Sequence, residues 1–212
     1  MDIRFLGAVE GVTGSCHLIR FKEKLIMLDC GMFQGKDQDL NHEPLPVNPA
    51  DVDYLFLSHS HIDHSGRIPL LVKNGFKGTI YCTKPTYELC EVMLLDSAHI
   101  QEVETEWKNR KAQRSGKPLV EPLYTIEDAE DSFKFFKPVL YDQIVQVDDG
   151  LTIRFRDAGH LLGSAIIEMW FREDDEFIKV VYSGDLGLAG KPLLKDPTVI
   201  ESADYVIIEA TY

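Results

Sequence analysis

A short polar run, His59-Ser60-His61-Ile62-Asp63-His64, lies just after the apolar segment 54–57 and restricts how this chain can fold. Three imidazoles and a carboxylate so close together are costly to bury unless they are hydrogen-bonded, paired or bound to a metal. Imidazole nitrogen suits zinc, and a nearby carboxylate suits a centre that activates water. The alternative, a solvated loop or hydrogen-bonded core histidines, leaves the partner residues elsewhere in the chain unexplained.

The spacing H-x-H-x-D-H provides two pairs of potential ligands. His59 and His61 lie two positions apart, so they point the same way if the strand direction briefly continues. Asp63 and His64 follow where the backbone is expected to turn, so they can face a second metal a few ångström away. The run therefore predicts a centre with two metal ions.

The composition is that of an ordinary globular protein, with 212 residues of which 44% are hydrophobic and 27% charged. No window approaches the roughly 18 consecutive apolar residues of a membrane span. The N-terminus lacks the basic region and apolar core of a secretion signal. The four cysteines show no C-x-x-C spacing, which favours free thiols in a reducing compartment and predicts a cytoplasmic protein without a membrane partner.

The formal net charge of −13 argues against non-specific attraction to nucleic acid. Two divalent ions would add about four positive charges locally, so the charge weakens a nucleic-acid hypothesis without removing it. Basic residues between 108 and 117 complement a helix C-terminus or face RNA, and the sequence leaves both interpretations open.

Apolar periodicity and turn residues predict a mixture of strands and helices. Strands are expected at 2–7, 16–21, 24–28, 52–58, 77–82, 143–147, 151–156, 165–171, 177–182 and 204–209, and helices from 66–69 to 74, from 85 to 116 and from 125 to 136. The glycine-rich stretch 7–14 is expected to form a tight hairpin rather than a phosphate-binding loop, and Asp149-Gly150 a type I′ turn. Residues 36–50 are expected to form a polar loop.

Potential ligands come directly after predicted strands. Asp29, the run from His59 to His64, His160, Asp185 and Glu209 each follow an apolar segment. Strand ends on one edge of a layered sheet form a common rim, so these side chains are expected to converge there. Asp29 alone fits either a turn former or a carboxylate that orients a ligand histidine.

The motifs around these residues resemble a known family in order and spacing. They are Leu28–Gly31, Ser58–Gly66, Ala158–Ala165, Tyr182–Asp185 and Ile208–Tyr212. Together they are similar to the successive motifs of the metallo-β-lactamase superfamily, and in detail to its β-CASP nucleases, over nearly the whole chain. The resemblance implies an α/β fold, the αββα sandwich, with a binuclear zinc site at the edge of its two sheets.

The resemblance also implies a role for each residue of the site. His59, His61 and His160 would hold the first zinc ion, Asp63 and His64 the second, and Asp185 would bridge the two. Asp29 would support the ligands from behind. Glu209 matches the acidic residue that opens the β-CASP signature, where Ala210 replaces the usual serine. The catalytic residues implied are Asp63, Asp185 and Glu209.

In that family, a β-CASP domain and a return segment with two further histidines follow this region. His17, His42 and His99 all lie too early in the chain to take those places. Residues 1–212 are therefore expected to form an incomplete metallo-β-lactamase-like domain, the N-terminal portion of a larger enzyme.

The expected function is zinc-dependent hydrolysis of phosphodiester bonds in RNA processing, by an endonuclease or an exonuclease. Single-stranded RNA is the expected partner, with DNA as a second substrate class and a homodimer left open. One alternative is a small-molecule hydrolase of the same superfamily, of thioesterase or lactonase type. Another is a non-catalytic partner subunit, which would be expected to have lost ligands. The six ligands expected in this stretch are all present, which argues against the non-catalytic subunit. Glu209 and the segment 159–165 favour the nuclease over the small-molecule hydrolase.

Residues 1–212 expressed alone are expected to bind the first zinc ion more tightly than the second, because the second has fewer ligands in this stretch. The same fragment should cleave RNA poorly and self-associate through an unpaired sheet edge. Metal content, light scattering and RNA cleavage, compared with an extended chain, test this expectation. A monomer with two metals and full activity would contradict it.

Overall fold

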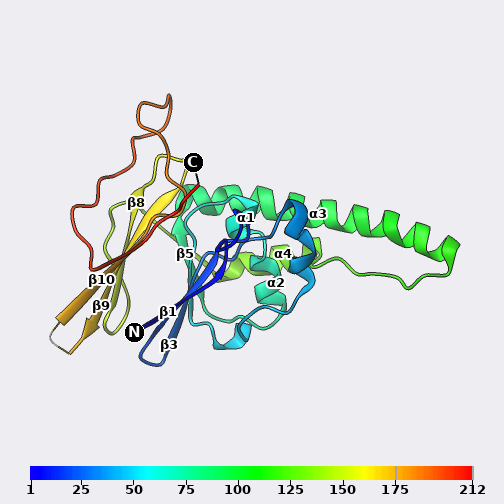
Figure 1. Ribbon diagram of the computed structural model, residues 1–212, viewed down its shortest axis with the longest axis horizontal. Helices are drawn as coiled ribbons and strands as arrows, with labels where there is room; N and C mark the ends of the chain where they lie inside the picture. The colour runs from blue at the N-terminus through cyan, green and yellow to red at the C-terminus, as the bar shows by residue number, and fades with distance from the viewer. Residues whose placement is uncertain (175, 212) are drawn as a thin grey trace.

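The computed structural model describes residues 1–174 and 176–211. Tyr212, the last residue of the Ile208–Tyr212 motif, lies outside the described residues. The chain forms two stacked β-sheets with helices on one side (Figure 1). None of the helices in the described part of the chain is both long and apolar enough to cross a lipid bilayer.

The first sheet contains six strands in the order of the sequence, β1-β2-β3-β4-β5-β6. They are β1 Asp2–Gly7, β2 Cys16–Phe21, β3 Lys24–Leu28, β4 Tyr54–Phe56, β5 Thr79–Thr83 and β6 Phe136–Val139. β1 to β3 pair antiparallel, whereas β3 to β6 pair parallel. The parallel part places the carboxyl ends of β3, β4 and β5 at one edge, where Asp29 and the histidine run emerge.

The second sheet contains five strands in the order β11-β10-β9-β8-β7. They are β7 Val145–Asp148, β8 Leu151–Asp157, β9 Ala165–Glu173, β10 Glu176–Tyr182 and β11 Tyr205–Ile207. The pairs are antiparallel except for β10 with β11, which run parallel. β8 and β10 therefore run in the same direction on either side of β9, and the chain leaves both of them toward the same edge.

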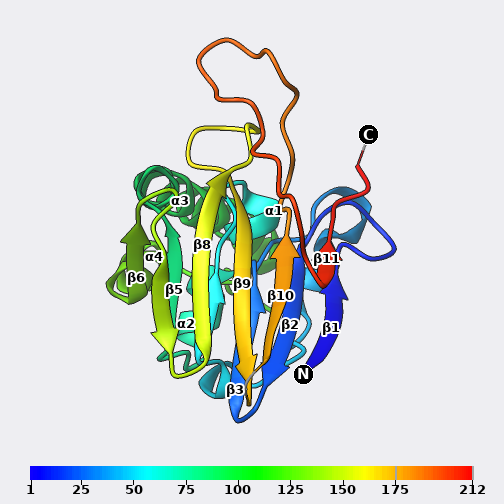
Figure 2. The same ribbon diagram turned by 90° about the vertical axis from the view of Figure 1, so that its left-hand side faces the viewer.

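The α-helices of the described residues lie on the side of the first sheet that faces away from the second (Figure 1). They are α1 Ile62–Ser65, α2 Ile68–Lys73, α3 Lys84–Ser115 and α4 Ile126–Ser132, with 3₁₀ turns η1 Gly35–His42, η2 Pro49–Asp51 and η3 Phe133–Phe135. α3 begins at the capping side chain of Thr83 and ends at Gly116, which adopts a left-handed φ of +66°. Figure 2 shows the outer face of the second sheet, which no helix covers within the described residues.

Two apolar layers hold the sandwich together. Between the sheets, Ile26 and Phe56 of the first sheet join Phe155, Ile167 and Phe171 of the second in one buried cluster. A second cluster fills the space between the first sheet and its helices. The two-sheet α/β sandwich expected from the sequence is thus confirmed.

The backbone turn expected at Asp63 and His64 is present as the short helix α1, Ile62–Ser65. Two other expectations about local structure were wrong. The third predicted helix ends earlier, and Phe136–Val139 joins the first sheet as β6, because pairing with β5 overrides the local pattern. The Asp149-Gly150 turn is not type I′, since Gly150 has a φ of +84° while Asp149 keeps a negative φ.

The predicted 36–50 loop contains η1 and η2, and the predicted β1–β2 pair is present. Its connection is not a tight hairpin, however. Residues 8–15 form an extended loop, and the amide of Ser15 donates to the carbonyl of Asp63. A loop expected to be local therefore reaches the histidine run.

Glu168 carries a charge on the outer face of the second sheet, and its side chain is only 1% exposed. Arg154 Nε and Lys179 Nζ each approach its carboxylate at 2.7 Å. Burial raises the pKa of Glu168, but the hydrogen bonds from Arg154 and Lys179 outweigh burial and hold the pKa below its usual range. The ionised form is therefore stabilised by the fold.

Glu168→Gln is expected to lower the free energy of unfolding by about 1–3 kcal/mol at neutral pH, because two cations lose their partner. Since the folded pKa lies below the unfolded one, this contribution is complete above about pH 4.3 and is lost as the pH falls through the folded value. Urea unfolding of metal-free protein at neutral and acid pH measures it. A wild-type-to-variant difference that persists in acid would contradict the assignment.

Candidate metal centre

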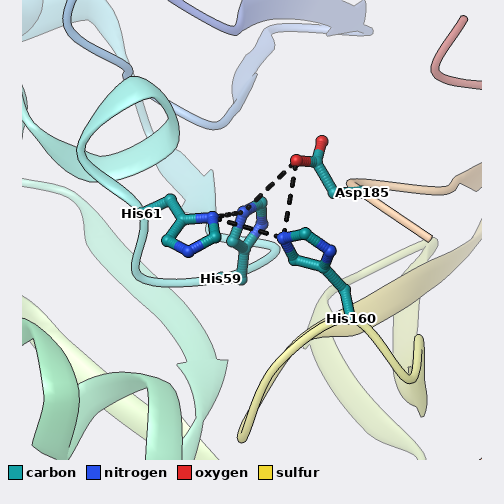
Figure 3. Close-up of side chains that lie close together, drawn as sticks. All are labelled: His59, His61, His160 and Asp185. Atoms are coloured by element: carbon teal, nitrogen blue, oxygen red, sulfur yellow. Dashed lines mark hydrogen bonds and ion pairs between the residues drawn. The ribbon is translucent and has the colours of Figure 1, made fainter. Parts of the chain in front are cut away.

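Four side chains converge at the edge where the strands end (Figure 3). His59, His61, His160 and Asp185 offer ligand atoms that all lie within 4.8 Å of one another. His61 Nδ1 is 3.1 Å from His59 Nε2 and 3.2 Å from His160 Nε2. Asp185 Oδ2 is 3.7 Å from the Nε2 atoms of both His59 and His160. These residues are 126 positions apart at most in the sequence but share one small space.

The spacing of these atoms suits a tetrahedral ion. Zinc binds imidazole nitrogen at about 2.0–2.1 Å, so the ligand atoms of a tetrahedral site stand about 3.3 Å apart. The separations of 3.1, 3.2 and 3.7 Å fall around that value. Three imidazoles and one carboxylate also form a donor set that zinc favours. The residues present therefore fit the metal that the sequence predicted.

A second group lies beside the first and shares Asp185 with it. His64 Nε2 is 3.2 Å from Asp185 Oδ1 and 3.9 Å from Asp63 Oδ2. The two oxygens of Asp185 thus face different groups: Oδ2 faces His59 and His160, and Oδ1 faces His64. This is the arrangement expected of a bridging carboxylate, and Asp63, His64 and Asp185 would hold the second ion.

Asp29 supports this second group from behind. Its side chain is fully buried, and its Oδ2 lies 2.7 Å from His64 Nδ1. The contact orients the ring so that Nε2 points toward Asp63 and Asp185. Asp29 also adopts a left-handed φ of +56°, a conformation that Asp tolerates better than most residues. The backbone and the chemistry of the position therefore favour the same residue.

The surroundings set the charge of each ring. Burial lowers the pKa of His59 well below its usual value and also lowers that of His160, so both rings are neutral and able to bind a metal. Burial lowers the pKa of His64 too, but hydrogen bonds with Asp185 and Asp29 outweigh it and raise the pKa to about 10. Burial raises the pKa of Asp185, while the hydrogen bond from His64 outweighs it and lowers the pKa.

The loop that carries His160 is fixed at both sides. Ser164 Oγ accepts from the backbone amide of His160 at 3.1 Å. The hydroxyls of Thr83 and Thr86, at the start of α3, donate to the carbonyl of Gly163 at 2.7 and 2.9 Å. The longest helix therefore anchors the loop of a predicted ligand.

Close backbone contacts set the distances between the ligand loops. A Cβ on Gly31 would lie 1.6 Å from the carbonyl oxygen of Asp63, and one on Gly187 would lie 1.7 Å from that of Gly159. A side chain at either place would push apart segments that carry predicted ligands. Glycine at 31 and 187 thus permits backbone to pack directly on backbone.

The structure places Glu209 next to the centre but outside the four-residue group. Its carboxylate accepts from the amide of Leu186, the residue after Asp185, and its own amide donates to Ser183 Oγ at 3.0 Å. These contacts hold the segment that presents Asp185. The catalytic role inferred for Glu209 stays a prediction, as does that of Asp63.

Sequence reasoning missed the polar residues that surround the ligands, namely Ser15, Ser58, Thr83, Thr86, Ser164 and Tyr182. Ser58 and Tyr182 stand inside the quoted motifs, yet Tyr182 meets Asp29 across 153 positions. The available signal was a hydroxyl at the end of an apolar strand. His99 is exposed on α3.

A comparison with protein families shows to which family the chain belongs. The model described as "Metallo-beta-lactamase superfamily domain" matches residues 18–203. The chain belongs to the metallo-β-lactamase superfamily. A Cronobacter sakazakii metallo-β-lactamase with a mutated HARLDQ motif has a similar fold, with a TM-score of 0.51 and 20% identity over 85% of this chain and 61% of that one.

Two curated relatives of this superfamily member cover nearly all of its sequence. Ribonuclease TTHA0252 of Thermus thermophilus is 36% identical over 212 residues, 100% of this chain and 44% of the relative. Cleavage and polyadenylation specificity factor 73 of Drosophila melanogaster is 31% identical over 220 residues, 100% of this chain and 29% of the relative. Such relatives are what the β-CASP resemblance predicts, and the resemblance is confirmed. The chain spans less than half the length of either relative.

His59→Ala and His160→Ala are each expected to remove the tighter zinc ion, because each loses one nitrogen of the first group. Zinc content after dialysis against a weak chelator measures the loss, with the exposed His99→Ala as the control. Asp29→Ala should weaken zinc binding by about 10–100-fold rather than abolish it. Unchanged zinc stoichiometry in both histidine variants would show that the first group is not a metal site.

Proposed function

We propose that this superfamily member is a zinc-dependent hydrolase that cleaves phosphodiester bonds in RNA. The observation that carries the proposal is the position of Asp185: its Oδ2 faces the imidazoles of His59 and His160, and its Oδ1 faces that of His64. Two ions held by these residues would supply the chemistry used for in-line displacement at phosphorus. The 36% identity to a ribonuclease supports RNA as the polymer.

When bound, two zinc ions supply an activated water and neutralise charge on the phosphate oxygens. The chain's own residues would hold these ions and arrange the space around them. His59, His61 and His160 provide the imidazole donors of the first set, and Asp63 with His64 provides the second set. The carboxylates of Asp63 and Asp185 can take up a proton that leaves the attacking water. Because these groups are fixed by buried contacts, little reorganisation is needed during the reaction.

The charge of the chain affects how a polyanion would approach. With a net charge of −13, the surface as a whole repels RNA. The attraction would come from the ions themselves, together with the basic end of α3, where Lys111 Nζ lies 4.7 Å from the centre of the exposed Trp107 ring. Single-stranded RNA would therefore be attracted at these few places rather than along a continuous basic groove.

Asp185→Asn in the full chain is expected to abolish cleavage of labelled RNA, because the bridging charge is lost while the shape of the side chain is kept. Asp149→Asn, at an exposed carboxylate paired with Arg172, is the matched control and should cleave normally. Circular dichroism checks that both variants fold. Wild-type turnover of a thioester or lactone, with no cleavage of RNA or DNA, would favour a small-molecule hydrolase instead.

A further inference from the structure

Behind the predicted ligands lies a buried polar cluster built around Asp29. It consists of Ser15, Asp29, Ser58 and Tyr182, each 4% exposed or less. None of the four belongs to the group whose ligand atoms converge on one ion. Burying a polar side chain costs free energy unless it forms hydrogen bonds, so the hydrogen-bond partners of these four residues indicate their role.

The carboxylate of Asp29 accepts hydrogen bonds from three residues. Its Oδ1 accepts from the amide of Ser58 at 2.7 Å. Its Oδ2 lies 2.8 Å from Ser58 Oγ, 2.6 Å from the hydroxyl of Tyr182 and 2.7 Å from His64 Nδ1. A carboxylate can only accept, so Ser58, Tyr182 and His64 must each donate to it. His64 Nδ1 therefore carries a proton that it donates to Asp29, and Nε2 is the atom that faces the predicted metal position.

Ser58 extends the same logic to the first group. Its Oγ also lies 3.0 Å from His59 Nδ1. A hydroxyl has one proton, and the carboxylate of Asp29 is both the closer and the stronger acceptor. His59 Nδ1 must then donate to Ser58 Oγ, which leaves His59 Nε2 without a proton. That atom is the one facing His61 and Asp185.

Tyr182 fixes the other side of the carboxylate. Because its single proton goes to Asp29, the hydroxyl of Ser15, at 3.0 Å, donates to the Tyr182 oxygen. The amide of Ser15 in turn donates to the carbonyl of Asp63 at 2.8 Å. Tyr182 thus links Asp29, which orients His64, to the loop that holds Asp63. Both contacts concern the second group rather than the first.

We propose that Ser58 and Tyr182 are positioning residues of the metal centre, which hold the Nδ1 atoms of two histidines so that Nε2 faces the metal. Ser58 acts on His59 directly, and Ser58 and Tyr182 act on His64 through Asp29. Ser58 serves both groups, because it contacts His59 directly and Asp29 twice. Tyr182 serves the second group. The inference rests on the proposed metal centre and is independent of the substrate.

Two substitutions separate these roles with little change in shape. Tyr182→Phe should weaken binding of the second zinc ion by about 10–100-fold and leave the first within a few-fold of wild type. Ser58→Ala should weaken both ions by about 10–100-fold. Competition with a chromophoric chelator measures each affinity in the full chain. The matched controls are Tyr124→Phe, whose fully buried hydroxyl lies 2.9 Å from Ser97 Oγ, and Ser132→Ala, whose buried hydroxyl donates to Ala129.

A measurement on metal-free wild-type protein gives an independent test that does not require a variant to fold. Long-range ¹H–¹⁵N correlation spectra distinguish the two neutral tautomers of a histidine, and His59→Ala assigns the signal. The proton is expected on Nδ1 of His59, and Ser58→Ala should abolish this preference. A proton on Nε2 in the wild type overturns the proposal.

Second-ion affinity unchanged in Tyr182→Phe, or lowered equally in Tyr124→Phe, overturns it as well. Failure of the metal centre itself is distinguishable, because the wild type would then bind no zinc.

Discussion

The rest of the structure depends on how the buried carboxylate of Asp29 is paired, because the burial of an unpaired charge costs several kcal/mol. Asp29 avoids that cost only where the end of β4, the end of β10 and the helix α1 all meet its two oxygens. β4 and β10 belong to different sheets. The charge is therefore satisfied only after the two sheets have stacked and the histidine run has turned into α1. The stacking that forms the sandwich therefore also brings the residues of the candidate metal centre together.

The same stacking explains how residues so distant in sequence form one site. The first sheet delivers Asp29 and the histidine run from neighbouring parallel strands, and the second delivers His160 and Asp185 after β8 and β10. Apolar packing between the sheets, around Phe56 and Phe155, holds the two rims together. The first group of ligands draws on both sheets, so a local change in either one would be felt at the metal.

Most of the architecture could be predicted from the sequence, because strands of alternating or continuous apolar residues and ligands at their ends leave a clear pattern. The predicted ligands His59, His61, His160 and Asp185 do converge. The errors occurred where long-range contact overrides local preference, as at β6 and in the turn after Asp148. The contacts of Ser58 and Tyr182 with Asp29 could not be predicted, since serine and tyrosine at a strand end are common and no local signal names their partner.

Glu209 illustrates a different limit. A motif predicts that the residue matters, but the structure shows its carboxylate on the amide of Leu186. A side chain can thus be essential to a site through the backbone it holds. Sequence patterns seldom distinguish such residues from those that touch the reacting atoms.

The glycine contacts at Gly31 and Gly187 have a consequence for which ions the protein accepts. Because backbone already touches backbone there, the ligand loops cannot move closer together. Most protein sites bind divalent transition metals in the same order of affinity, with copper bound most tightly. Discrimination between metals therefore depends on the size and geometry of the binding site. A side chain at either place would widen the rim, and the narrow rim that glycine permits would disfavour larger ions such as calcium, which need more ligands and longer bonds. Two residues without side chains would thereby contribute to metal selectivity.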